Sequence, residues 1–382
     1  MRCRFDRAAR RIHRKQCRVV DAVLNLGKHA KIRIDGKLIS TEHAVLDPET
    51  TQKLIYSILD NTQIARFEKD LELDMSFGIG GLGRFRTNVF MQRGAIGAVL
   101  RVIPYEIKTF RDLGLPEDLL TQLCGVPKGL MLVTGATGSG KSTSLAAMID
   151  HCNQHVGGHI VTIEDPVEFV YQDRKSTITQ RGIGEDTLSP SRALRAALRQ
   201  NPDVILAGEM RDRETMELAL HAAETGHLVM STLHTNDAKQ SVTRITDAFP
   251  PEQKKGLLRM LSHTLRAVVS QRLLRRADGS GRVAAHEIMI VSPTIQQLIE
   301  KGDLEGMAKA IASSSSYYRM QSFNQSLAEL VRKRLITPDI AMANTSSPGD
   351  LKLMLKGMSR SSGMSSVGPA DGFREEEAPP KK

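Results

Sequence analysis

The sequence predicts an α/β protein with at least two domains, the larger one built on a parallel sheet. A chain of 382 residues is longer than one ordinary domain, and its hydrophobic content of 40% is enough for packed cores. From residue 129 onward, short apolar segments alternate with helical patterns, which is typical of parallel strands buried on both faces. The predicted strands are LMLVT (130–134), HIVTIED (159–165), DVILAGE (203–209) and HLVMSTLH (227–234).

Residues 30–107 predict a smaller α+β module before this domain. Ala30–Ser40 alternates apolar and polar residues around an Asp-Gly pair, which indicates a strand or hairpin. PETTQKLIYSILD (48–60) has the apolar spacing of a helix with proline near its start, and strands joined by glycine-rich turns follow in residues 71–104. We expect residues 108–128 to link this module to the larger domain.

The part of the chain after residue 250 is expected to be mainly helical. The apolar pattern predicts a helical segment from Pro250 to about Leu274, followed by a hairpin in LLRRADGSGRVAAHEIMI (273–290). The larger domain would then cover residues 129–290. Helices are expected in residues 291–358, and a disordered polar tail in residues 359–382.

Basic charge is concentrated at the start of the chain. Residues 1–33 hold eleven Lys or Arg against two Asp, which is a net charge of +9 out of a total of +10. The nearly neutral remainder argues against a broad nucleic-acid surface. We expect residues 1–29 to form a basic arm that is disordered or marks an incorrectly assigned start. The four cysteines form no CxxC pair and are interpreted as reduced cytosolic thiols, and no apolar run is long enough for a membrane span.

The most specific motif is a phosphate-binding loop at GATGSGKS, residues 135–142. It fits G-x-x-x-x-G-K-[ST], with a predicted strand before it and a helix after it, as the motif requires. Glycines let backbone amides face a phosphate, while Lys141 would reach the outer phosphates and Ser142 would ligate Mg²⁺. The simpler alternative is a glycine-rich turn with an exposed lysine. The expected nucleotide-binding residues are Gly135, Ala136, Thr137, Gly138, Ser139, Gly140, Lys141, Ser142 and Thr143.

Acidic residues follow the next two predicted strands. Glu164, Asp165 and Glu168 stand in TIEDPVEF, and Glu209 follows Gly208 at the end of the other strand. Ligands of parallel sheets lie at the carboxyl ends of the strands, so a carboxylate there can orient water or hold Mg²⁺ through water. The alternatives are a solvated acidic turn and a core strand that ends in a surface acid. A usual Walker B strand carries aspartate where Gly208 stands, which keeps the second alternative open.

Two histidines flank the last predicted strand, in TGHLVMSTLHT. At a strand end, His227 or His234 could sense or polarise a terminal phosphate. No His-x-x-His or Cys/His spacing accompanies them, so zinc is not indicated. A hydrogen-bonded structural histidine is the alternative for each.

The succession of these four groups resembles that of the secretion-type traffic ATPases. TIEDPVEF, GEMRDRETMELALHAAETGHLVMSTLHT and AAHEIMI are similar to segments of the PilT/PilU retraction ATPases of type IV pili, and the resemblance covers roughly residues 30–358. It implies a RecA-like P-loop ATPase domain, a smaller PAS-like α+β N-terminal domain and a helical C-terminal part.

The resemblance also assigns catalytic roles. Glu168 would activate the attacking water, Glu209 would hold Mg²⁺ through water, and the two histidines would form a histidine box. Arg86 in GRFRTNVF and Arg101 in GAVLRVIP match N-terminal-domain arginines that approach the phosphates, with ordinary strand-surface arginines as the alternative. The resulting catalytic candidates are Glu168, Glu209, His234, His227, Arg86 and Arg101.

The setting that the resemblance implies is a cytoplasmic motor of an inner-membrane pilus machine. The cofactors would be ATP and Mg²⁺, and the assembly a homo-hexameric ring with ATP between neighbouring subunits. Its partners would be a paralogous retraction ATPase and the cytoplasmic face of a pilus platform protein, with no nucleic acid. Domain rotation would convert hydrolysis into the work of pilus retraction and twitching motility.

The chain departs from the retraction ATPases in three places. Residues 1–28 lack the usual first segment, which indicates a divergent first strand or an incorrectly assigned start. PTIQQLIEKGD (293–303) lacks the arginine of the corresponding PilT helix, and the tail continues past the usual end. The last two features favour PilU or an additional PilT paralogue.

Two other functions stay open. A regulatory ATP-binding paralogue with weak activity of its own is one, and a nucleic-acid motor is the other, although the nearly neutral body of the chain argues against it. An assembly ATPase is disfavoured because Cys124 and Cys152 stand alone, without a four-cysteine zinc insertion.

Overall fold

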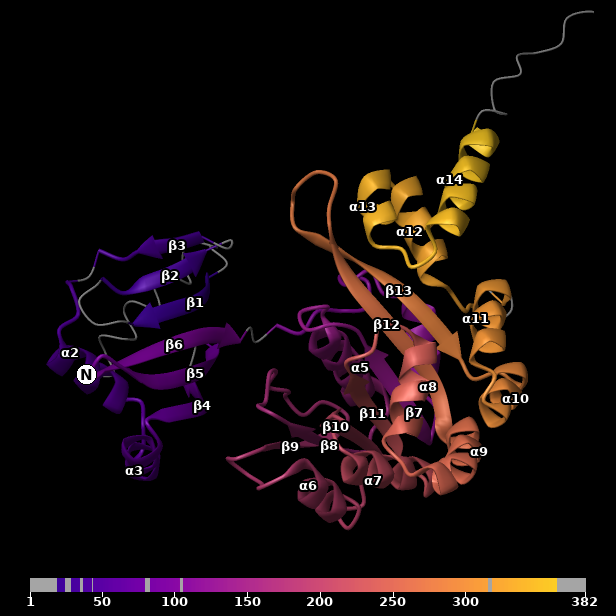
Figure 1. The fold of residues 1–382 in the computed structure, drawn as a ribbon. Helices are drawn as coiled ribbons and strands as arrows, with labels where there is room; N and C mark the ends of the chain where they lie inside the picture. The colour runs from indigo at the N-terminus through magenta and orange to yellow at the C-terminus, as the bar shows by residue number, and fades with distance from the viewer. Residues whose placement is uncertain are drawn as a thin grey trace, which may run out of the picture.

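A computed structural model describes residues 19–24, 29–34, 37–42, 44–79, 83–103, 106–314 and 318–362. They form two β-sheets with their own helices, which lie side by side in Figure 1. The predicted tail from residue 363 onward and the first 18 residues of the predicted basic arm lie outside the described residues.

The N-terminal domain is a six-stranded antiparallel sheet in the order β3-β2-β1-β6-β5-β4. Along β5, Phe85 and Val89 are buried while Arg84 and Arg86 are partly exposed, because alternate side chains of a strand point to opposite faces. Helices α2 and α3 contribute to the core on the buried face. The elements are β1 (Val19–Leu24), β2 (Lys31–Ile34), β3 (Lys37–Ser40), α2 (Pro48–Tyr56), α3 (Asn61–Asp70), β4 (Glu72–Ile79), β5 (Gly83–Gln92) and β6 (Ala95–Ile103).

The start of this domain differs from the expectation. Residues Val19–Leu24, which we expected in a basic arm, form β1 in the middle of the sheet, between β2 and β6. The segment VVDAVL has the apolar composition of a strand with a neighbour on each side. The Arg-rich residues before it made this pattern hard to recognise in the sequence. The predicted hairpin in Ala30–Ser40 and the helix that begins at Pro48 are confirmed.

The larger domain contains a seven-stranded sheet in the order β13-β12-β7-β11-β10-β8-β9, in which only β13 is antiparallel to its neighbour. Four of the strands confirm the sequence prediction. The strands are β7 (Gly129–Thr134), β8 (His159–Glu164), β9 (Thr177–Gly182), β10 (Val204–Glu209), β11 (Leu228–Leu233), β12 (Leu265–Arg275) and β13 (Arg282–Ile290).

Helices cover both faces of this sheet (Figure 1). Two of them, α4 (Glu117–Cys124) and α5 (Lys141–His155), bury their apolar residues on one face, and α4 lies in the segment that we expected to be a linker. The other face is covered by α6 (Pro190–Ala197), α7 (Arg213–Glu224), α8 (Ala238–Asp247), α9 (Lys254–Thr264), α10 (Pro293–Lys301) and α11 (Leu304–Ser313), with the short 3-10 helix η1 (Pro251–Gln253) before α9.

The last three helices form a separate small core with the β12–β13 hairpin. They are α12 (Phe323–Arg332), α13 (Pro338–Ala343) and α14 (Pro348–Ser362). Their apolar residues pack with Leu274 of β12 and Ala285 of β13. No helix in the described part of the chain is both long enough and apolar enough to span a bilayer.

The expected helix after Pro250 also differs from the structure. The helix that we expected to reach about Leu274 ends at Thr264, and Leu265–Arg275 instead forms β12, parallel to β7 and antiparallel to β13. Six of the first seven residues of β12 are buried, including the polar Ser270 and Gln271, so burial follows neither the alternation of a half-exposed strand nor the period of a helix. Such a buried run does not distinguish a helix from a doubly covered strand.

Candidate functional site

The predicted phosphate loop lies where the motif requires, between the carboxyl end of β7 and the start of α5. Helix α5 begins after Gly140, whose φ of 92° is left-handed, and no side chain in the described part of the chain caps its first turn. By contrast, α6, α7 and α8 each begin with a serine or aspartate side chain that accepts a backbone N–H. The first amides of α5 are therefore open to an anion.

The loop needs glycine because β12 passes close behind it. A Cβ on Gly135 would lie 2.4 Å from the Gln271 carbonyl oxygen, and one on Gly140 would lie 2.9 Å from Gln271 Nε2. The buried Gln271 side chain donates to Ser139 O at 2.7 Å and accepts from Ser144 Oγ at 2.9 Å. One side chain thus connects the loop, the helix after it and the neighbouring strand.

Lys141 lies over its own loop. Its Nζ donates to Gly135 O at 2.8 Å and to Ala136 O at 3.1 Å. Burial lowers the pKa of Lys141, while the negative charges of Glu209 and Glu168 act in the opposite direction. Both predicted acids are therefore electrostatic neighbours of the phosphate-loop lysine.

Glu209 lies at the end of β10 between two cationic or polar partners. Its Oε2 accepts from Arg211 Nη2 at 2.9 Å, and its Oε1 lies 3.1 Å from His234 Nε2. Burial raises the pKa of Glu209, but the hydrogen bond from Arg211 and the charges of His234 and Arg211 outweigh it, so the pKa is lowered overall. Glu209 is accordingly an ionised carboxylate at neutral pH.

The glycine before Glu209 has a packing reason. A Cβ on Gly208 would lie 2.8 Å from Ile163 O of β8, so a side chain there requires the two strands to move apart. This contact accounts for the absence of aspartate at that position and leaves Glu209 as the acid at this strand end.

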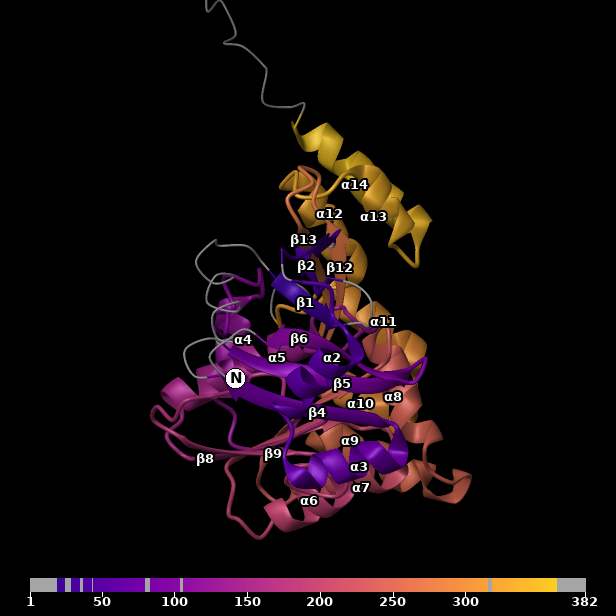
Figure 2. The same cartoon turned by 90° about the vertical axis from the view of Figure 1, so that its left-hand side faces the viewer.

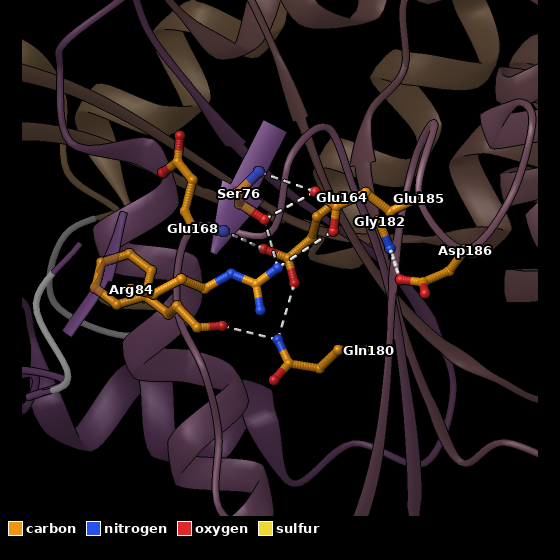
Figure 3. Close-up of polar contacts among 9 residues, drawn as sticks. Ser76, Arg84, Glu164, Glu168, Gln180, Gly182, Glu185 and Asp186 are labelled. Carbon is orange, nitrogen blue, oxygen red and sulfur yellow. Dashed lines mark hydrogen bonds and ion pairs between the residues drawn. The ribbon is translucent and has the colours of Figure 1, made fainter. Parts of the chain in front are cut away.

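Glu168 is held by the partly buried acid four residues before it (Figure 3). The Glu168 amide donates to Glu164 Oε2 at 3.3 Å, and Glu164 Oε1 accepts from Thr162 Oγ1 at 2.8 Å and from Gln180 Nε2 at 3.3 Å. Burial raises the pKa of Glu164, and the hydrogen bonds from Thr162, Glu168 and Gln180 oppose that rise. Glu164 therefore positions the turn, which leaves the partly exposed Glu168 carboxylate available for chemistry.

The arginines of the N-terminal domain lie on the sheet face that meets the larger domain. Ser76, Arg86 and Arg101 are neighbours across β4, β5 and β6, so they share one face. Ser76 donates to Glu185 Oε1 of the larger domain through its amide at 3.0 Å and its hydroxyl at 2.9 Å (Figure 3). This contact brings the Ser76 end of the row to the loop after β9, and Figure 2 shows the N-terminal sheet in front of the larger domain.

His227, which the resemblance places in the histidine box with His234, lies outside this cluster. It precedes β11, its Nδ1 lies 2.9 Å from Ala222 O, and its backbone oxygen accepts from Gly129 N at the start of β7. At about 3.3 Å per residue, β11 separates His227 from His234 by roughly 20 Å. The two ends of a strand lie at opposite edges of the sheet, so this position and the hydrogen bond to Ala222 favour the structural alternative for His227.

Sequence reasoning missed three residues that shape the site. Gln271 was hidden in the segment mistaken for a helix, Gln180 lies on β9, which was not predicted, and Arg211 carries no signal beyond its closeness to Glu209. The described residues contain no group of three or more His, Cys, Asp or Glu placed to hold a metal. A divalent cation here would need phosphate oxygens and water as its other ligands.

Comparisons with known proteins agree with this geometry. The family model "Type II/IV secretion system protein" matches residues 28–333. The chain is 46% identical over 328 residues to the "Type IV pilus retractation ATPase PilT" of Pseudomonas aeruginosa, covering 86% of this chain and 94% of that protein. It is 40% identical over 336 residues to the "Type IV pilus ATPase PilU" of the same organism, covering 88% and 87%.

Solved structures show the same fold. A crystal structure of the pilus retraction motor PilT with bound ADP has a TM-score of 0.83 and 46% sequence identity, and the similarity covers 90% of this chain and 98% of that one. The combination of phosphate loop, strand-end acids and antiparallel N-terminal sheet is that of a nucleotide-binding ATPase. The chain belongs to the type II/IV secretion system protein family and is an ATPase of that family.

Proposed function

We propose that this protein is a hexameric ATP-hydrolysing motor that powers type IV pilus retraction. The observation that carries the proposal is the phosphate loop with Glu209 and Glu168 as charge neighbours of Lys141, in a chain that matches PilT over 94% of the PilT length. The uncapped start of α5 supports binding of the nucleotide phosphates at this place.

The chain's own groups divide the work of phosphoryl transfer. The loop amides and Lys141 hold the outer phosphates, which requires Lys141 to exchange its two carbonyl partners for phosphate oxygens. Glu168 accepts a proton from the attacking water and aligns it. Such positioning and charge compensation supply most of the catalysis in this class of reaction.

Mg²⁺ fits the residues at this edge. The exposed Ser142 at the start of α5 and the ionised Glu209 would hold it, the latter through water. When bound, the ion would neutralise charge on the phosphates.

The N-terminal domain would close the site. Its arginine-bearing face lies toward the loop after β9, so a rotation of this domain moves Arg86 and Arg101 relative to the nucleotide. In a homo-hexamer, successive rotations would produce the mechanical stroke. The motor would act in the cytoplasm against the inner-membrane pilus platform.

Purified full-length protein tests this function. Lys141→Ala is expected to abolish ATP hydrolysis, and Glu168→Gln is expected to lower turnover by about 10²-fold or more while ATP still binds and the ring still assembles. Glu305→Gln, an exposed half of an ion pair with Lys239, is the matched control and should hydrolyse at the parent rate. Hydrolysis by Glu168→Gln at the parent rate would refute the catalytic assignment.

An accessory role like that of PilU is the second candidate. It is favoured by the sequence of α10, which lacks the arginine that the resemblance to PilT implies. A retraction motor should sustain twitching alone, whereas an accessory should need a paralogue. Deletion of the gene should leave cells piliated but impaired in twitching or pulling force, and loss of all surface pili would contradict both roles.

A further inference from the structure

The loop after β9 is a compact turn closed by its own hydrogen bonds. Asp186 Oδ2 accepts from Gly182 N at 2.8 Å, and Asp186 N donates to Gly182 O at 2.8 Å. Gly184 N donates to Thr187 O at 2.7 Å. A turn tied in this way moves as one unit, so a contact at its tip is transmitted to its base.

The tip of this turn binds the N-terminal domain. One carboxylate, that of Glu185, accepts from Ser76 N at 3.0 Å and from Ser76 Oγ at 2.9 Å on Oε1, and Arg84 Nη2 lies 3.3 Å from Oε2 (Figure 3). The Arg84 side chain is 25% exposed and that of Glu185 is 35% exposed. Three donors from two strands on one half-buried carboxylate make a more specific contact than a surface ion pair.

The base of the turn is bonded to the segment that carries the proposed catalytic acid. Gly182 pairs with Glu164 across β9 and β8, and Ile183 N donates to Glu164 O at 2.9 Å. Two residues earlier on β9, Gln180 Nε2 donates to Glu164 Oε1 at 3.3 Å and to Phe169 O at 2.8 Å. The bonds from this strand and turn thus reach both sides of Glu168.

We propose that Glu185 is a positioning residue that couples the orientation of the N-terminal domain to the placement of Glu168. The coupling path runs from Ser76 and Arg84 through Glu185 and the turn to Glu164, whose carboxylate accepts the Glu168 amide. This inference rests on the proposed function, in which Glu168 activates water. Under this proposal the N-terminal domain acts on Glu168 of its own chain through Glu185. This role is separate from that of Arg86 and Arg101, which are proposed to face the phosphates.

The test uses full-length protein and separates turnover from binding. Glu185→Ala is expected to lower kcat for ATP by about five- to tenfold while KM changes less than about twofold, because coupled residues contribute at this scale. Glu185→Gln keeps an acceptor for Ser76 but loses the charge that faces Arg84, so its kcat should lie between those of the parent and Glu185→Ala. Glu214→Ala removes an exposed carboxylate paired with Arg195 at 2.8 Å in the same domain and should leave kcat unchanged.

A double-mutant cycle identifies the path. If Arg84 acts through Glu185, Arg84→Ala combined with Glu185→Ala should be no slower than Glu185→Ala alone. Hydrogen exchange should be faster at residues 164–169 in Glu185→Ala than in the parent, which a merely local effect at the tip would not produce.

Three results would overturn the proposal. They are an unchanged or increased kcat in Glu185→Ala, a change confined to KM, and full additivity with Arg84→Ala. Measuring Glu168→Gln in the same assay distinguishes failure of the coupling proposal from failure of the proposed function. If it is inactive while Glu185→Ala is normal, only the coupling fails, whereas parental activity of Glu168→Gln removes the proposed function itself.

Discussion

The two sheets of this protein carry their polar chemistry in different places. In the larger domain the central strands are buried on both faces, and the side chains proposed to act on the nucleotide lie at or after their carboxyl ends, as with Lys141, Glu168, Glu209 and His234. In the N-terminal domain the sheet is antiparallel and half exposed, and Arg84 and Arg86 stand along one strand face. The strand ends of the larger sheet are fixed relative to one another by the register of that sheet. The exposed face of the N-terminal sheet, by contrast, is placed by the position of its whole domain.

This difference indicates how the site is assembled. The larger sheet supplies a rigid edge at which the phosphate loop and acids meet, since β7, β8, β10 and β11 are each bonded to a strand on both sides. The antiparallel sheet supplies a charged surface that, under the proposed domain rotation, would approach or leave that edge. Substitutions at the edge should therefore abolish binding or chemistry, while substitutions on the face should weaken the coupling between domains.

The largest effect is expected at the edge, from Gly135→Ala. A Cβ there would lie 2.4 Å from the Gln271 carbonyl oxygen, and φ is 143°, so the loop cannot keep its shape. We expect nucleotide affinity to fall by more than about 10³-fold in a fluorescent-ADP titration, because the loop amides supply the phosphate contacts. Gly279→Ala, with φ of 72° and open space around it, is the control and should bind normally. Normal binding by Gly135→Ala would mean that the edge is not rigid.

The arginine-bearing face should show the next effect. Arg86→Ala is expected to lower kcat by about 10²-fold with little loss of nucleotide affinity, because a donor that meets developing charge acts in the transition state. Steady-state hydrolysis and ADP binding measure the two quantities. Arg66→Ala, which removes an exposed pair with Asp70 on α3, should behave like the parent. Equal losses in both variants would show that the face acts only through stability.

The support behind the phosphate loop should matter less than the loop itself. Gln271→Ala leaves Ser139 O and Ser144 Oγ without their buried partner, at a cost of about 1–3 kcal/mol. We expect the Kd for ADP to rise about tenfold. Gln154→Ala, an exposed glutamine on α5 that donates to Asp150 at 2.6 Å, is the control. An unchanged Kd would assign the loop's shape to its glycines alone.

The smallest expected effect is on the free energy of unfolding, depends on pH, and comes from Glu287 in the β12–β13 hairpin. Burial raises the pKa of Glu287 on β13 from 4.5 to about 7, although its hydrogen bond from the Ala238 amide opposes the rise. The folded chain binds this proton more tightly than the unfolded chain does, so the stability contribution is lost as the pH rises from about 4.5 through 7.

Glu287→Gln removes this loss and keeps an oxygen for Ala238 N. It is expected to raise the free energy of unfolding by about 1–3 kcal/mol at pH 8 and by much less at pH 5. Denaturant titrations at the two pH values measure the difference, with Glu305→Gln as an exposed control. Equal shifts at both values would contradict the assignment.

Sequence reasoning reached the parts of the fold that have a local signal. The four central strands and the phosphate loop were predicted because apolar runs and a spaced glycine motif are read without knowing what packs around them. The strand β12 was mistaken for a helix because its buried run has no period, and β1 was hidden by neighbouring arginines. Both segments are recognised as strands only from the strand that each pairs with in the sheet. This partner is β7 for β12 and β6 for β1.

The same limit explains the site. Glu168 and Glu209 follow predicted strands, so their meeting near Lys141 could be expected from sheet topology. Gln271 and Glu185 could not be expected, because their partners lie 132 and 109 residues away in sequence. His227 was placed with His234 because a motif joins them in sequence, although one strand separates them in space.

One more consequence comes from two adjacent residues of β12. Gln271 points to the phosphate loop, whereas Arg272 points to the opposite face, where its guanidinium lies 4.2 Å from the centroid of the Phe323 ring and also binds Asn344 O. The helices α12–α14 are thus anchored by Arg272, the residue directly after the one that contacts the phosphate loop. A shift of α12–α14 would therefore act on β12 directly beside Gln271, the residue that holds the phosphate loop.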